Sequence, residues 1–476
     1  MIISACGAKS SGLGTDGGGP DGVTGPDGVP ASDGPAPDGL ASDGPASDGP
    51  ASDGPANLCD AVPVLDGLTL HVDPVSGDDQ ATGSGTRSGA PRAACALRSL
   101  TRATSLATAA GKKSMKIVID VSATVGSLET FPIAVPGNTT IAPAPGVVVT
   151  VLVGAGDGFT MSNAGATLDA LILDGQGTAT NGIAVTAGTP GSPNVVSGVE
   201  VKGFTSAGVR ASGSAVMTLT AGANLHENGT ASSASSAGLL ATDTAVVTVN
   251  GDGASELHPT QLSLNHARGI EALGQAQVNL TGTPSALTPG AGTVVVRMNS
   301  LDGVWIEQLL VASGAAPPQG MTMTGLVSTL NGGSGIHVFG GSGVKVRGSY
   351  LSNNTAHGVH VQTDPAFING GAGANDGNTI TRLDFGVAGD LGHNVLQDDA
   401  NPNTLKGACL DLAGGGGLGG LLALEGNVFA AGGSRVDCAS IAGSLAATNE
   451  CGTTGPLGDV GRNPRNDFDV AQCTVP

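Results

Sequence analysis

The sequence predicts an all-β fold, a single-stranded parallel β-helix (solenoid) closed at one end by an N-terminal capping helix. A short phrase, Asn-x-x-x-Gly-[Ile/Val], recurs along the chain at intervals typical of stacked repeat folds. Each copy continues into a short alternation of apolar and polar residues, which is the pattern of a half-buried strand. Glycine makes up 80 of the 476 residues and aromatic residues only 2%, a composition that favours short strands and tight turns.

The repeat is clearest in the central part of the chain, where its glycine returns after 26, 30, 31, 34, 32 and 23 residues. Asparagine tolerates the left-handed turn conformation, and identical asparagines on successive turns can hydrogen-bond as a ladder. Strands separated by four or five residues leave no room for helical crossovers, so each turn of chain rests on the previous one at about 4.8 Å. The strict copies carry Gly269, Gly303, Gly335 and Gly358, and the looser copies carry Gly182, Gly208 and Gly238.

Residues 160–400, which contain these copies, resemble the right-handed parallel β-helix repeats of pectin-lyase-like proteins. The resemblance implies a right-handed β-helix, which we expect to occupy residues 116–405. It leaves the activity open, because this fold hosts lyases, hydrolases, adhesins and uncharacterised surface proteins.

Residues 70–110 resemble an uncharacterised N-terminal domain of bacterial β-helix proteins, with a strand, a glycine-rich turn region and an amphipathic helix. One face of that helix would carry Leu97, Leu100, Ala103 and Ala107, and Gly111 would end it. Because the open end of a solenoid needs a lid, we expect this helix to close it. The segment KIVIDV at 116–121 would then be the first buried strand.

The N-terminal 56 residues predict an anchor and a spacer. Ile3-Ser4-Ala5-Cys6 resembles a bacterial lipobox, so residues 1–6 are interpreted as a truncated lipoprotein signal with lipidation at Cys6. Residues 7–56 consist mainly of Gly, Pro, Ser, Ala and Asp and are predicted to form a disordered linker. We therefore expect a protein of the cell envelope, lipid-anchored to a bacterial membrane and facing the periplasm or the exterior.

Six cysteines follow Cys6, an even number that favours disulfides in an oxidising compartment, although the sequence leaves their pairing open. Their grouping predicts an N-terminal cap region at 57–115 and C-terminal disulfide-stapled coils at 406–476. No Cys/His spacing indicates zinc, and we expect neither a metal nor a cofactor. The six are Cys59, Cys95, Cys409, Cys438, Cys451 and Cys473.

The formal net charge of −20, without a stripe of Lys and Arg, argues against nucleic acid as a partner. No apolar run reaches the ~18 residues of a membrane-spanning helix, so contact with the membrane is expected through the lipid anchor only. We expect a monomer.

Outward-facing side chains on the repeat strands should form two parallel rows, because the residue after each inward Ile or Val points away from the core. An exposed aromatic ring beside hydrogen-bonding groups suits the apolar face and the hydroxyls of a sugar. The alternative is a solvated face that happens to carry a few large side chains. The first row contains Ala184, Arg210, Leu240, Glu271, Trp305, His337 and His360, and the second contains Glu307, Phe339 and Gln362.

Catalysis has weaker support in the sequence. A pectate-lyase type of site could use Glu271, Asp302 and Glu307 with Arg268 and Arg297. However, Asp302 and Arg268 are expected to lie in turns, and the five residues are spread over several rungs. Inverting hydrolysis needs two carboxylates about 6.5–9.5 Å apart, and no rung carries an evident Asp pair.

Two further polar groups have structural readings beside the functional ones. Asp78-Asp79 is interpreted as turn structure of the cap, with a calcium ligand as the alternative. His337 and His360 could bind a metal across rungs, but the sequence offers no evident third ligand.

The sequence therefore predicts a cell-surface lipoprotein whose rigid β-helix is non-enzymatic, without catalytic residues, and binds polysaccharide through the face around Trp305. One alternative is a polysaccharide lyase or glycoside hydrolase of the pectin-lyase-like type. A second alternative is a structural adhesin.

Overall fold

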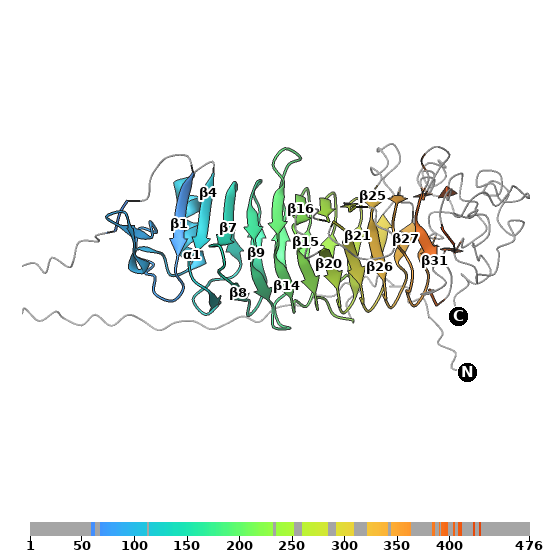
Figure 1. The fold of residues 1–476 in the computed structure, drawn as a ribbon, viewed down its shortest axis with the longest axis horizontal. Helices are drawn as coiled ribbons and strands as arrows, with labels where there is room; N and C mark the ends of the chain where they lie inside the picture. Colours follow the sequence, from blue (N-terminus) through green and yellow to red (C-terminus); the bar gives the residue numbers. More distant parts are fainter. Residues whose placement is uncertain are drawn as a thin grey trace, which may run out of the picture. The chain divides into compact units, whose positions relative to one another are not determined.

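The computed structural model describes residues 59–61, 67–111, 114–231, 235–251, 259–283, 292–308, 321–340, 344–362, 383–385, 390, 392–397, 403–404, 408–411, 422–423 and 428–429. All of them belong to one compact unit, Cys59–Thr474, whose strands succeed one another in chain order along a stack of coils (Figure 1). Within these ranges, no helix has the length and hydropathy needed to cross a membrane.

Each coil gives one strand to each of three parallel sheets, named here sheets 1, 2 and 3. Sheet 1 consists of β1 (Leu68–Val72), β4 (Met115–Ile119), β7 (Thr139–Pro143), β10 (Thr167–Asp169), β13 (Asn194–Ser197), β16 (Val216–Thr220), β19 (Val246–Asn250), β22 (Gln277–Thr281), β25 (Met321–Thr324), β28 (Val344–Arg347), β30 (Leu383–Asp384) and β33 (Leu422–Ala423). Sheet 2 consists of β5 (Ala123–Val125), β8 (Val149–Leu152), β11 (Ile172–Asp174), β14 (Glu200–Lys202), β17 (Asn224–His226), β20 (Thr260–Ser263), β23 (Val294–Arg297) and β26 (Leu326–Thr329).

Sheet 3 carries the repeated phrase and consists of β6 (Ile133–Ala134), β9 (Asp157–Met161), β12 (Asn181–Val185), β15 (Ala207–Ala211), β18 (Ala237–Ala241), β21 (Arg268–Leu273), β24 (Val304–Gln308), β27 (Ile336–Gly340), β29 (Val359–Gln362) and β32 (Ala408–Asp411). Two small pairs complete the strands, the hairpin β2 (Thr86–Arg87) with β3 (Ala90–Pro91) and the parallel pair β31 (Val395–Gln397) with β34 (Val428–Phe429).

The repeat is in register from coil to coil, as the sequence predicts. The apolar residue after each glycine pairs with its equivalent on the next coil, so Ile270 is opposite Val304 and Val304 is opposite Ile336. These three side chains are fully buried and belong to one continuous apolar core inside the coils. Because side chains alternate along a strand, the residues between them point outward and form columns of their own.

The repeated glycines are required because neighbouring coils approach closely at this corner. A Cβ added at any of six of them would lie 2.5–2.9 Å from the carbonyl oxygen of the glycine on the next coil. Glycine at these positions leaves space for the backbone of the following coil. The six are Gly182, Gly208, Gly238, Gly269, Gly303 and Gly335.

The repeated asparagines form the ladder that the sequence predicts. Nδ2 of Asn265 donates to Oδ1 of Asn299 at 2.9 Å, and Nδ2 of Asn299 donates to Oδ1 of Asn331 at 2.9 Å. Each side-chain oxygen also accepts the backbone N–H of the preceding asparagine, so that these buried polar groups are satisfied between coils. The ladder comprises Asn228, Asn265, Asn299, Asn331, Asn354 and Asn403.

The N-terminal cap differs in two details from the expectation. Helix α1 spans Leu100–Ala110 and ends at Gly111 in the left-handed conformation, as predicted, but Leu97 precedes the helix. Leu97 is buried through a bridge to Val72 of β1, and β1 pairs with β4 in sheet 1. The strand of the cap is therefore the first strand of the solenoid, and KIVIDV contains the second.

A half-buried carboxylate and a disulfide fix the cap. Asp79 accepts hydrogen bonds from the backbone of Arg98 and Ser99 and from the Ser99 hydroxyl, which supports the turn-structure reading of Asp78-Asp79. The short helix η1 (Ala93–Cys95) precedes α1, and a disulfide joins Cys95 to Cys59.

We predict that Asn299→Ala lowers the free energy of unfolding by about 3 kcal/mol, because it leaves buried donors and acceptors on two coils without partners. The matched control is Asn163→Ala at an exposed position, which should change stability by about 0.5 kcal/mol or less. Urea unfolding of both variants checks this. Equal stabilities of the two variants would show that the ladder contributes nothing.

Candidate functional site

The outer face of sheet 3 brings the two predicted rows together. Glu271 of β21 is opposite Trp305 of β24, which is opposite His337 of β27, which is opposite His360 of β29. The second row runs beside it, with Glu307 opposite Phe339 and Phe339 opposite Gln362. The side chain of Gln362 lies outside the described part of the structure.

The middle of this face is not a solvated surface. Glu271 is only 1% exposed and His337 8% exposed, although both side chains point away from the core. Trp305, Glu307 and Phe339 are partly exposed around them. A solvated face with a few large side chains is therefore the wrong description of this part of sheet 3.

Arg268 links Glu271 to Trp305. It is the first residue of β21 and not a turn residue as expected, and its Nη1 donates a hydrogen bond to Oε1 of Glu271. Its guanidinium carbon lies 4.1 Å from the centroid of the Trp305 ring, a cation–π contact. The other carboxyl oxygen of Glu271, Oε2, is buried and has no hydrogen-bond partner.

Glu271 exchanges its proton near neutral pH. Burial, with a smaller contribution from the nearby charge of Glu307, raises the pKa of Glu271 to about 7, although Arg268 opposes the shift. A carboxyl group with such a pKa can donate a proton under conditions in which exposed carboxyl groups are ionised.

Glu271 and Glu307 come from neighbouring coils, on either side of Trp305. Glu307 lies two residues beyond Trp305 in β24, and its Oε2 accepts a hydrogen bond from Trp305 Nε1 at 3.3 Å. The sequence analysis named both residues in a possible site but set them aside, because they lie on different rungs. The column spacing of the repeats is the signal that could have revealed the pair.

The histidine end of the row contains a second buried carboxylate. Asp302 lies in the connection before β24, as expected, with Oδ2 3.5 Å from Nδ1 of His337. Burial opposes ionisation of Asp302, but the charge of His337 and hydrogen bonds from His337 and the Ser334 N–H hold its pKa below the usual range. Nε2 of His337 is buried without a hydrogen-bond partner.

His360 is shielded from water more strongly than its predicted exposed position suggests. Its ring centroid lies 4.2 Å from that of His337 and 5.4 Å from that of His357, a residue that the sequence analysis did not single out. Burial, together with the charges of these two histidines, lowers the pKa of His360 to about 3. His360 is therefore neutral at physiological pH, with Nε2 buried and without a hydrogen-bond partner.

The aromatic rings of the site pack against one another. The ring centroids of Trp305 and His337 are 4.2 Å apart, edge to face. Those of Trp305 and Phe339 are 5.9 Å apart with the planes tilted by only 16°, so the two partly exposed rings form one nearly parallel aromatic surface.

Other predicted residues lie elsewhere. Arg297 belongs to sheet 2, where its Nη2 lies 3.4 Å from Oε1 of Gln261, and so it does not join the cluster. Among the residues that the structure describes, no three His, Cys, Asp or Glu side chains are grouped so as to hold a metal ion. Cys409 is in β32 opposite His360, but its side chain lies outside the described part, as do Cys6, Cys438, Cys451 and Cys473.

Comparison with known proteins places the fold and not the family. No family model matches the chain, and no curated protein matches its sequence. Among solved structures, the A-modules of two mannuronan C-5 epimerases from Azotobacter vinelandii are similar. The AlgE6 module is 17% identical over 69% of this chain and 88% of its own, with a TM-score of 0.42, and the AlgE4 module is 16% identical over 65% and 86%, with a TM-score of 0.39.

The chain is a right-handed parallel β-helix, as the repeats and the resemblance predicted. The expectation of a non-enzymatic module requires correction, because the outer face of sheet 3 holds a buried carboxyl group, Glu271, whose pKa is raised to about 7. The two similar structures are named as epimerases of a polysaccharide. At 16–17% identity the likeness concerns the fold, so the chemistry has to be argued from the site itself.

The raised pKa of Glu271 predicts a pH-dependent stability. The folded state retains this proton where the unfolded state, with a pKa near 4.5, has lost it, so the contribution of Glu271 becomes less favourable as pH rises toward 7. Relative to the wild type, Glu271→Gln should gain about 2–3 kcal/mol between pH 5 and pH 8.5. Urea unfolding at both pH values checks this.

Glu200→Gln is the control for this measurement. Burial alone would raise the pKa of Glu200, but hydrogen bonds to Lys202 and His226 lower it overall, so its stabilisation is present at neutral pH and lost in acid. Glu200→Gln should therefore lose stability, relative to the wild type, at the higher pH. A Glu271→Gln variant that behaves like the Glu200→Gln variant would contradict the burial of the Glu271 carboxyl.

Proposed function

We propose that this protein is an enzyme that cleaves a polysaccharide by general acid–base catalysis on the outer face of sheet 3. The observation that carries the proposal is the pair of carboxyl groups, Glu271 and Glu307, that two neighbouring coils place around Trp305, with the pKa of one raised to about 7. Two carboxyl groups whose environments separate their proton affinities are the usual machinery of glycoside hydrolysis. Lipobox-like residues 3–6 and the linker support action at the cell envelope.

In this reaction Glu271 donates its proton to the glycosidic oxygen as the bond between that oxygen and the anomeric carbon breaks. Glu307 accepts a proton from the water that attacks the anomeric carbon. The products are two shorter chains, one with a new reducing end. Glu307 then releases its proton to solvent and Glu271 takes one up, which returns the site to its starting state. Trp305 and Phe339 offer the aromatic surface on which the apolar face of a sugar ring can rest.

The substrate has to open the cluster to reach Glu271, because this side chain is only 1% exposed. Arg268 lies over the Trp305 ring, and a cation–π contact of this kind contributes about 0.5–2 kcal/mol. That energy is small enough for a bound sugar to replace the contact with stacking of its own on the ring.

A second reaction uses the other end of the row. His337 has a buried Nε2 without a partner, and Arg268 supplies a fixed positive charge nearby. In β-elimination from a uronate-containing chain, neutral His337 takes the proton next to the carboxylate and Arg268 balances the negative charge that develops there. The glycosidic bond breaks, its oxygen leaves with the proton of Glu271, and one product end becomes an unsaturated sugar. The products distinguish this reaction from hydrolysis.

The test is a panel of neutral and uronate-containing polysaccharides incubated with the wild type, Glu271→Gln and the control Glu200→Gln. We expect new reducing ends with the wild type and the control, and a rate at least about 100-fold lower with Glu271→Gln, since general acid catalysis contributes about 10²–10⁴-fold. The wild-type rate should fall as pH rises through about 7, because the acid form of Glu271 is lost. Unsaturated product ends would indicate elimination instead of hydrolysis.

Two outcomes would contradict the proposal. One is the absence of any cleavage by the wild type across the panel. The other is cleavage that Glu271→Gln leaves unchanged, which would place the active site elsewhere.

A further inference from the structure

The outer face of sheet 1 carries a repeated Thr-x-Thr arrangement that the proposed function does not use. Strands β16 and β25 contain it as Thr218-Leu219-Thr220 and Thr322-Met323-Thr324. Alternate residues of a strand share a face, so the two polar residues point outward while the apolar residue between them is buried. The two strands between them vary the arrangement by one asparagine each, as Thr248-Val249-Asn250 in β19 and Asn279-Leu280-Thr281 in β22.

The outward residues are in register from coil to coil and form two columns. Val195 of β13 is opposite Thr218, and Thr218 is opposite Thr248. In the second column, Thr281 is opposite Thr324. Neighbouring coils lie about 4.8 Å apart, and residues two apart along a strand lie about 6.6 Å apart, so the face is a regular grid. The first column consists of Val195, Thr218, Thr248, Asn279 and Thr322, and the second of Ser197, Thr220, Asn250, Thr281 and Thr324.

This grid carries no charged side chain, in a chain that contains 19 basic and 39 acidic residues. Outward residues of sheets 2 and 3 on the same coils include Lys202, Arg210 and Glu271. The preference of threonine for strands accounts for the hydroxyl groups but not for the missing charge. Sheet 1 therefore differs from the other two faces of the same coils.

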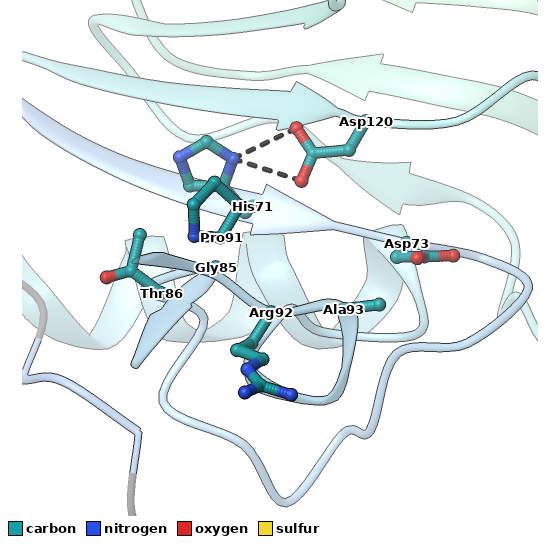
Figure 2. A pocket seen from close by; sticks show the side chains of 8 residues that line it. All are labelled: His71, Asp73, Gly85, Thr86, Pro91, Arg92, Ala93 and Asp120. Carbon is teal, nitrogen blue, oxygen red and sulfur yellow. Dashed lines mark hydrogen bonds and ion pairs between the residues drawn. The ribbon is translucent and has the colours of Figure 1, made fainter. Parts of the chain in front are cut away.

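Charged side chains begin where the grid ends. Towards the cap, Asp169 of β10 adjoins the first coil of the grid, and His71 of β1 forms an ion pair with Asp120 at 3.0 Å (Figure 2). Beyond β25, Lys345 of β28 forms an ion pair with Asp390. The uncharged stretch thus occupies the five coils of β13, β16, β19, β22 and β25.

The hydroxyl groups in the middle of the grid are available to water. Thr218, Thr220 and Thr248 are partly exposed, and their hydroxyl groups make no hydrogen bond with any residue that the structure describes. Val216 and Val246 continue the grid as a third, apolar column. Methyl groups cannot hydrogen-bond, so water above them bonds to other water, while the hydroxyl groups hold this layer at fixed positions.

The spacings of the grid are close to those of ice. In ice, tetrahedral hydrogen bonds of about 2.75 Å place second-neighbour oxygens about 4.5 Å apart, and the layers repeat after about 7.3 Å. The corresponding spacings of the grid are about 4.8 Å and 6.6 Å. Over the four intervals between five coils, the difference along the stack adds up to about 1.2 Å, less than half the length of one hydrogen bond.

We propose that the grid on sheet 1 binds ice, the ordered lattice of water molecules. An uncharged grid suits this partner, because the lattice is uncharged and a fixed charge would orient water away from it. A stable protein partner would need about 800 Å² from each side, whereas the grid spans about 19 Å by 7 Å between its outermost Cα positions. The binding is independent of the site on sheet 3.

The test is the partition of the full chain into a slowly growing ice crystal, with serum albumin in the same solution as the reference for passive trapping. The wild type should be enriched in the ice relative to albumin. Thr248→Tyr should lower this enrichment at least about fivefold, because the ring holds the lattice away from hydroxyl groups on neighbouring coils, each of which contributes a factor of about 2–12. The matched control is Thr160→Tyr, at an outward threonine of β9 on sheet 3, which should leave the enrichment unchanged.

A second variant, Thr220→Lys, places a charge on a different coil of the grid and should also lower the enrichment. Urea unfolding midpoints equal to that of the wild type establish that these variants are folded. Wild-type protein no more enriched than albumin, or enrichment that either grid variant leaves unchanged, would overturn the proposal. Glu271→Gln should be enriched as the wild type is, which separates this result from the cleavage assay, and its loss would place ice binding on sheet 3 instead.

Discussion

The in-register hydrogen bonding of parallel strands from coil to coil is the constraint on which the rest of this structure depends. Because every coil places the same position of the repeat above its predecessor, residues far apart in sequence become neighbours at about 4.8 Å. The same register stacks asparagines inside a corner, glycines where backbones approach, and functional side chains outside. A one-residue slip would exchange the inner and outer faces of a strand, which the continuous apolar core opposes.

The column on sheet 3 shows what such stacking can produce. Glu271, Trp305 and His337 are each an ordinary outward residue of a single strand, but together they exclude water from one another. Burial then raises the pKa of Glu271 to about 7. Buried polar atoms without partners, such as Glu271 Oε2 and His337 Nε2, have a free-energy cost that a ligand can offset.

The fold could be predicted from the sequence because each coil repeats the same pattern of residues. Spacing of the Asn and Gly positions predicted the strands of sheet 3, their register, the asparagine ladder and the membership of both outward rows. The spacing did not predict the chemistry of the site, which depends on distances between coils and on side-chain conformations. The contact of Arg268 with Trp305, the approach of Asp302 to His337 and the His71–Asp120 pair leave no periodic signal.

The prediction of a non-enzymatic function was the larger error, and it arose from the way in which a solenoid arranges its side chains. Acidic residues were compared within rungs, whereas a solenoid builds its sites between rungs, so that Glu271 and Glu307 were judged too dispersed to act together. The assumption that outward residues are solvated also concealed the shifted proton affinity of Glu271. Columns, and not strands, are the units in which a β-helix sequence is best searched for catalytic groups.

The most direct test of this account is a ¹³C NMR titration of the glutamate side-chain carboxyl groups in labelled protein. The signal of Glu271 is assigned by its disappearance in the Glu271→Gln spectrum. The account predicts a midpoint close to 7 for that signal. A midpoint near 4.5, the value of an unshielded glutamate, would contradict the buried acid on which the proposed chemistry rests.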